Sequence, residues 1–193
     1  MTTRTGRMVL AAVCALALSV GAGWMWSALD GDDADSVSIG PVSLNDVRPP
    51  TIGTNAALGG SALPSAAVTD LGGTPVDTAS LVGTPLVVNV WGSTCGPCKR
   101  ELPDFAEAHR RFGNDVRFVG ISYLPASARE EAFARDFGVA YELLYDGNGA
   151  FISAAGISAF PVTLFVSPDG TVVEQSGALD AERLAAIIEE QLL

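Results

Sequence analysis

A short apolar run that ends beside two closely spaced cysteines constrains this chain more than any other feature. Residues 86–91 have the sequence Leu-Val-Val-Asn-Val-Trp and are bounded by Gly-Thr-Pro before and Gly-Ser after. Such a run is typical of a buried central strand. Cys95-Gly96-Pro97-Cys98 follows directly, and the apolar positions after it then recur at helical spacing up to Phe112. The sequence therefore predicts a strand, a cysteine pair and a helix in immediate succession.

The rest of residues 64–193 alternates between strand-like and helix-like segments, which predicts an α/β domain. Strands are expected over residues 116–123 and 141–145, and a hairpin over 161–175 around Pro168-Asp169-Gly170. Helices are expected after Ser127, over 148–155, and after Asp180. Ser127 is followed three residues later by Glu130, a capping-box spacing, and Asp180 is a typical N-cap.

The N-terminal part of the chain has a different composition. Residues 8–26 carry no charge, follow Arg4 and Arg7, and precede a cluster of aspartates that begins at Asp30. This pattern predicts a membrane-targeting segment over 1–26, with the remainder exported; an uncleaved signal anchor is favoured over a cleaved signal peptide. Residues 27–63 are rich in Asp, Ser, Gly and Pro and are expected to form a flexible tether to a folded domain over 64–193.

Composition excludes several classes of function. Eleven Lys and Arg against twenty-two Asp and Glu give a net charge of −11, which argues against binding to a nucleic-acid backbone. Three cysteines and one histidine are too few for a tetrahedral zinc site or a disulfide scaffold. Cys14 lies inside the apolar run and is interpreted as a small apolar residue in lipid. No metal or organic cofactor is expected.

The two cysteines of the Cys95-Gly96-Pro97-Cys98 motif are predicted to be redox-active. Their spacing on a first helical turn brings the sulfurs within bonding range, and the helix N-terminus favours a thiolate on Cys95. Cys98, more buried, is then placed to resolve a mixed disulfide. The alternatives are a structural disulfide, half of a zinc site with His109, and two reduced core cysteines; a loop this short is a poor staple, and His109 is expected to be a packed core residue.

Residues 87–103 resemble the active-site segment of membrane-anchored TlpA/ResA-like thioredoxin-fold thiol:disulfide oxidoreductases. The resemblance covers residues 64–193 and includes an upstream segment over 68–76, a helix-plus-strand insertion at about 124–146, and Phe160-Pro161-Val162-Thr163. It implies a thioredoxin-like α/β fold, with a central mixed sheet flanked by helices and preceded by the membrane segment and linker.

The resemblance also implies a set of site residues. Pro161 would follow a cis peptide bond in a loop beside the cysteines, and Phe160 would offer its backbone N–H and C=O to an extended substrate. The substrate would further contact Trp91, Gly96 and Pro97.

Departures from the family pattern affect the expected chemistry. Asn89 stands where ordinary thioredoxins have a buried Asp, and it cannot take a proton from Cys98. Glu101 matches an acidic residue of TlpA/ResA-like proteins and is expected to be the base for Cys98. Thr94 replaces a Trp, which thins the aromatic wall of the substrate groove. Lys99 and Arg100 add positive charge near Cys95, or form a solvated helix surface.

The implied activity is dithiol exchange that reduces disulfides of exported proteins. The resemblance suggests the haem-binding cysteines of apocytochrome c as substrate and a DsbD/CcdA-like membrane protein as electron donor. The opposite direction, a disulfide-forming oxidase, is the main alternative, and a client-binding module with incidental cysteines is another. A thiol peroxidase is disfavoured because Val88 and Gly92 stand where its Pro-x-x-x-Thr-x-x-Cys spacing requires Pro and Thr.

Overall fold

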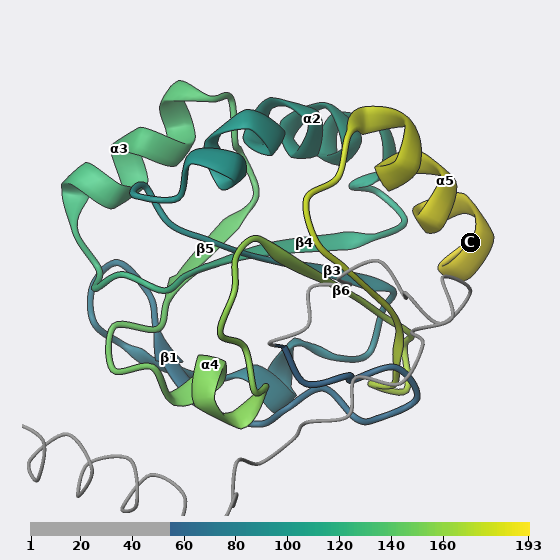
Figure 1. Ribbon diagram of the computed structural model, residues 1–193, viewed down its shortest axis with the longest axis horizontal. Helices are drawn as coiled ribbons and strands as arrows, with labels where there is room; N and C mark the ends of the chain where they lie inside the picture. The colour runs from purple at the N-terminus through teal and green to yellow at the C-terminus, as the bar shows by residue number, and fades with distance from the viewer. Residues whose placement is uncertain (1–54) are drawn as a thin grey trace, which may run out of the picture. The chain divides into compact units, whose positions relative to one another are not determined.

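A mixed β-sheet with helices on both faces forms the described part of the chain, which in this computed structural model is residues 55–193 (Figure 1). The predicted membrane-targeting segment over 1–26 and residues 27–54 of the predicted tether lie outside the described residues. Within residues 55–193, no helix is both long enough and apolar enough to cross a membrane.

The sheet has seven strands in the order β2-β1-β5-β4-β3-β6-β7. Their bounds are Ala67–Thr69 (β1), Pro75–Asp77 (β2), Leu86–Trp91 (β3), Arg117–Ser122 (β4), Glu142–Tyr145 (β5), Val162–Val166 (β6) and Val172–Ser176 (β7). Strands β3, β4 and β5 are parallel, whereas β6 is antiparallel to β3 and β7 to β6. All six residues of β3 are buried, as the apolar run predicts.

Two apolar cores lie on opposite faces of this sheet. The helices are η1 (Thr78–Leu81), α2 (Gly96–Phe112), α3 (Ala128–Asp136), α4 (Ala150–Ala154) and α5 (Ala181–Gln191). Figure 1 shows α2, α3 and α5 on one side of the sheet and α4 on the other. Side chains alternate along a strand, so Val87 and Trp91 pack with the first group, whereas Leu86, Val88 and Val90 pack on the α4 side.

The local sequence signals for helix and turn boundaries are confirmed. The Ser127 hydroxyl accepts a hydrogen bond from the Glu130 N–H, and the Asp180 carboxylate accepts one from the Arg183 N–H, so both residues are N-caps. In the hairpin turn, Asp169 accepts hydrogen bonds from the Ser167 hydroxyl and the Thr171 N–H. These contacts explain why the predicted elements begin and end close to their predicted positions.

The predicted start of the folded domain at residue 64 is wrong. Residues 55–63 form a strap that packs on the α4 side of the sheet, with Leu58 only 8% and Leu63 only 6% exposed. The N–H groups of Gly60 and Leu63 donate to the carbonyls of Val172 and Gly170, both at 2.8 Å. Two leucines in a stretch rich in Gly and Ala show no periodicity, yet they suffice to fix the strap because backbone hydrogen bonds accompany their burial.

Candidate redox site

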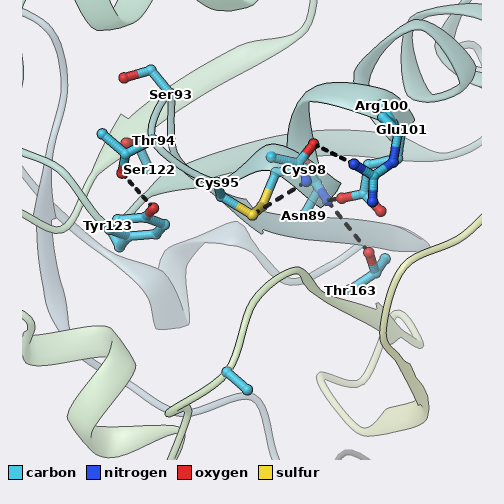
Figure 2. Close-up of a disulfide and its surroundings, with 12 residues drawn as sticks. Asn89, Ser93, Thr94, Cys95, Cys98, Arg100, Glu101, Ser122, Tyr123 and Thr163 are labelled. Carbon is cyan, nitrogen blue, oxygen red and sulfur yellow. Dashed lines mark hydrogen bonds between the residues drawn. A yellow bond between two sulfur atoms is a disulfide. The ribbon is translucent and has the colours of Figure 1, made fainter.

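Cys95 and Cys98 form a disulfide, with an S–S distance of 2.06 Å, at the point where β3 leads into α2 (Figure 2). Cys95 is the N-cap of α2, and its Sγ accepts a hydrogen bond from the Cys98 N–H at 3.2 Å. Cys95 is 9% exposed, whereas Cys98 is fully buried. A helix N-terminus with free N–H groups favours a thiolate, so Cys95 is the sulfur that is both reachable and activated.

Glu101 lies in the second turn of α2, three residues after Cys98, and is only 2% exposed. Its carboxylate accepts hydrogen bonds from the Asn89 side-chain amide at 2.9 Å and from the Leu179 N–H at 3.3 Å. Burial raises the pKa of Glu101 to about 7, and the nearby Asp104 charge adds to this effect, against the two hydrogen bonds, which lower it. A group that titrates near neutrality therefore adjoins Cys98 on the same helix.

Asn89 holds Glu101 from the adjacent strand. Its side-chain amide, 1% exposed, donates to Glu101 and, at 3.4 Å, to the Thr163 hydroxyl on β6 (Figure 2). The amide oxygen of Asn89 has no hydrogen-bond partner among the described residues. An amide does not exchange protons near neutral pH, so this residue orients the carboxyl group and leaves proton exchange to it.

Tyr123 connects the cysteine loop to the loop before β6. Its hydroxyl is 2.8 Å from the Thr94 hydroxyl, and its ring lies 4.4 Å from the ring of Phe160, centroid to centroid. A Cβ on Gly92 would come within 2.5 Å of the Tyr123 ring, so only glycine fits there. Tyr123 thus supplies aromatic surface beside Thr94. This role was not predicted, because its only sequence signal is that Tyr123 follows β4, whose end lies next to the end of β3.

The Glu130 side chain anchors the loop between β3 and the cysteines. Its carboxylate, 3% exposed, accepts hydrogen bonds from the Ser93 N–H and the Ser122 hydroxyl, both at 2.8 Å. Only half of the predicted capping box therefore forms, because the Ser127 hydroxyl caps the helix while the Glu130 side chain turns to the cysteine loop. The capping-box spacing of Ser127 and Glu130 singled out Glu130 in the sequence, but it predicted a helix-capping role and not a contact with the cysteine loop.

Asn55, the first described residue, clamps the loop that leads to Phe160 and Pro161. Its side-chain oxygen accepts hydrogen bonds from the Ser158 and Ala159 N–H groups, both at 2.8 Å, and its amide donates to the Ala159 carbonyl at 3.0 Å. No sequence signal points to this contact, because residue 55 lies in the stretch whose composition predicts a tether. The Phe160–Pro161 peptide is cis, as the family resemblance implies.

With this geometry, comparison with known proteins decides the family. Residues 60–175 match the AhpC/TSA family. The chain belongs to this family. The thiol-disulfide oxidoreductase ResA of Bacillus subtilis is 28% identical over 116 residues, 60% of this chain. That match spans 65% of the relative, slightly less than two thirds of its length.

Solved structures similar to this AhpC/TSA protein have the same fold. A secreted Mycobacterium tuberculosis disulfide oxidoreductase homologous to E. coli DsbE is 27% identical, with a TM-score of 0.55 over 64% of this chain and 93% of that one. The thioredoxin domain of a Bacteroides vulgatus thiol-disulfide oxidoreductase has a TM-score of 0.63 over 72% of this chain and 100% of its own, at 19% identity. The predicted thioredoxin-like α/β fold is confirmed, and the relatives and structures that this chain resembles are named thiol-disulfide or disulfide oxidoreductases.

One predicted substrate-contact residue of this AhpC/TSA protein is misplaced. Trp91 is fully buried, and its ring stacks on Phe133 of α3 at 6.0 Å, so it cannot contact a substrate. It shares the inner face of β3 with Val87 and Asn89, which the alternation of the strand requires. Gly96 and Pro97, by contrast, are exposed on the first turn of α2.

His109, the one histidine of the chain, packs among aromatic rings. His109 lies in the last turn of α2, edge-on to Phe118 and Tyr141 at 5.5 Å each, and burial lowers its pKa. It is a packed residue remote from Cys95, as expected. No group of three or more His, Cys, Asp or Glu side chains within residues 55–193 is arranged to hold a metal ion.

Proposed function

We propose that this protein reduces disulfide bonds of exported proteins through Cys95 and Cys98. The observation that carries the proposal is the arrangement of three groups at the start of one helix: Cys95, which is 9% exposed, Cys98, which is fully buried, and a buried Glu101 whose pKa is about 7. Thiol–disulfide exchange needs an attacking thiolate, a resolving thiol and an acceptor for the proton of that thiol.

The reaction follows from this order of groups. In the reduced chain, the Cys95 thiolate attacks one sulfur of a substrate disulfide; a mixed disulfide forms and the other substrate sulfur leaves as a thiolate. Cys98 then gives its proton to the Glu101 carboxylate and attacks the Cys95 sulfur. The mixed disulfide breaks and the second substrate sulfur leaves as a thiolate. The substrate has then gained two electrons, and Cys95 and Cys98 have been oxidised to a disulfide.

The proposed cellular setting comes from the N-terminal sequence and the resemblance to TlpA/ResA-like proteins. The protein is tethered to the outer side of the cytoplasmic membrane by residues 8–26, or secreted after cleavage. Apocytochrome c with an oxidised haem-binding pair is the proposed substrate, and a DsbD/CcdA-like membrane protein the proposed donor that restores the dithiol.

The reduction potential of the Cys95–Cys98 pair in the full chain tests the direction of the reaction. A reductase is expected to equilibrate near thioredoxin, about −270 mV, whereas a value near DsbA, about −120 mV, would replace the proposal by a disulfide-forming oxidase.

Trapping tests the roles of the two cysteines. The Cys98→Ala variant cannot resolve its adducts, so mixed disulfides with exported proteins are expected to accumulate on Cys95. The matched Cys95→Ser variant is expected to form no such adducts and to lose disulfide turnover. Retention of client proteins by Cys95→Ser, with no adducts on Cys98→Ala, would instead identify a client-binding module.

A further inference from the structure

The positive charges of the described chain are unevenly distributed. Residues 55–193 contain eight Lys and Arg against seventeen Asp and Glu. Four of the eight cations, at positions 110, 111, 117 and 135, form ion pairs with carboxylates within this part of the chain. The other four are Lys99, Arg100, Arg129 and Arg183; Lys99 and Arg100 follow Cys98 on α2, and Arg129 lines a hollow with Ser93 and Thr94 of the cysteine loop.

Helix stability does not explain these three cations. Lys99 and Arg100 follow Cys98 near the start of α2, and Arg129 is the second residue of α3. The N-terminal end of a helix carries partial positive charge, so cations there are disfavoured. Lys99 lies 5.5 Å from the centre of the Phe137 ring, and Arg100 donates to the Gly96 carbonyl at 3.3 Å; neither contact is an ion pair, although Arg100 lines a hollow that it shares with Asp104 and Asp180.

Arg129 lines two hollows beside the cysteine loop. Two hollows, of ≈ 310 and ≈ 330 Å³, lie between α3 and the cysteine loop, and both are lined by Ser93, Thr94 and Arg129. The carboxylate of Glu130 in the second hollow is committed to Ser93 and Ser122. Asp136 lines the first hollow but stands seven residues along α3 from Arg129, about 10 Å away.

We infer that the substrate is a polypeptide segment with carboxylate side chains next to its disulfide cysteine. This inference rests on the proposed function and adds the chemistry that selects the substrate. The segment extends from Cys95 across Thr94 into the hollows beside α3, where Arg129 receives a carboxylate, while Lys99 and Arg100 add positive potential around the sulfur. An acidic protein surface otherwise repels such a segment, so this cationic region defines where it binds.

Single-turnover reduction by the pre-reduced full chain tests the inference. Two peptides with the same disulfide are compared, one with Asp and Glu beside a cysteine and the other with Asn and Gln in their place. The acidic peptide is expected to react about five times faster at low ionic strength, since each exposed ion pair contributes about 1 kcal/mol at most, and the ratio is expected to fall at high salt.

Arg129→Gln is expected to reduce this rate ratio to about twofold, because only the potential of Lys99 and Arg100 remains. The matched control is Arg183→Gln. Arg183 is the fourth cation that forms no ion pair, and it lies outside both hollows, so this variant is expected to keep the full rate ratio between the two peptides. Each rate is divided by that for hydroxyethyl disulfide, a small neutral substrate, to remove any change in Cys95 reactivity.

Two results separate the failure of this inference from that of the proposed function. Equal rates for the two peptides, a faster reaction of the neutral one, or a ratio unchanged in Arg129→Gln would overturn the acidic substrate while leaving the reductase intact. Failure of the reduced chain to reduce either peptide or hydroxyethyl disulfide would overturn the proposed function itself.

Discussion

Replacing Glu101 by Gln should change the stability of the protein in a pH-dependent way. The folded chain raises the pKa of this carboxyl from its ordinary value of 4.5 to about 7, chiefly because it is buried. At about 1.4 kcal/mol per tenfold change in proton affinity, the difference corresponds to about 3 kcal/mol.

The direction in which the free energy of unfolding changes with pH depends on whether the folded or the unfolded chain binds the proton. Between pH 4.5 and about 7 the folded chain keeps the carboxyl protonated while the unfolded chain ionises it, so the free energy of unfolding falls as the pH rises through this window. Glutamine does not ionise, so the Glu101→Gln variant does not lose this free energy of unfolding between pH 4.5 and about 7. We expect the free energy of unfolding of Glu101→Gln, minus that of the wild type, to increase by about 3 kcal/mol from pH 4 to pH 8.5.

Urea unfolding of the full chain with the disulfide intact measures this difference at a series of pH values. Other titrating groups are common to both proteins and cancel, and so does the constant cost of a hydrogen bond that glutamine cannot make. Glu107→Gln, which removes a carboxylate from the same helix at a side chain that is 65% exposed, is the matched control. A Glu101→Gln difference that stays constant within about 1 kcal/mol would refute the buried, titrating carboxyl.

Three further predictions concern contacts around the site. Asp104→Asn removes a charge that raises the pKa of Glu101, so the pH dependence of mixed-disulfide resolution should move to lower pH; an unmoved profile would contradict the coupling. Asn55→Ala removes the side chain that bonds three backbone groups and should lower the free energy of unfolding by about 1–3 kcal/mol in urea, whereas no change would show that the strap is dispensable. Gly92→Ala places a methyl group 2.5 Å from the Tyr123 ring and should displace that ring from Phe160, so nuclear Overhauser effects between the two rings should disappear. Persistence of these effects would contradict the packing described.

Much of the fold was predictable because its signals are local. The buried strand β3, the helix α2 and the caps Ser127 and Asp180 depend on residues within one or two turns of chain. The cysteine pair was predictable for the same reason, since its spacing and its place after the strand are both visible in the sequence.

The contacts that complete the site could not be predicted in this way. Asn55 reaches a loop 103 residues away, and Glu130 reaches one 37 residues away. Neither contact leaves a periodic pattern, because each is made by a single polar side chain to backbone groups. Trp91 was misassigned because its closeness to the cysteines in sequence suggested closeness to substrate, whereas strand alternation turns its ring into the core.

The clamp by Asn55 has a mechanical consequence. Asn55 is held beside the loop that carries Phe160 and Pro161 by three hydrogen bonds of its side chain. Tension applied to the chain from its N-terminal side therefore loads this loop first, before any sheet hydrogen bond. Pulling the protein by its N-terminus should therefore disturb the loop before β6 first, whereas pulling it by its C-terminus should first load α5 and the Leu179–Glu101 hydrogen bond that precedes it.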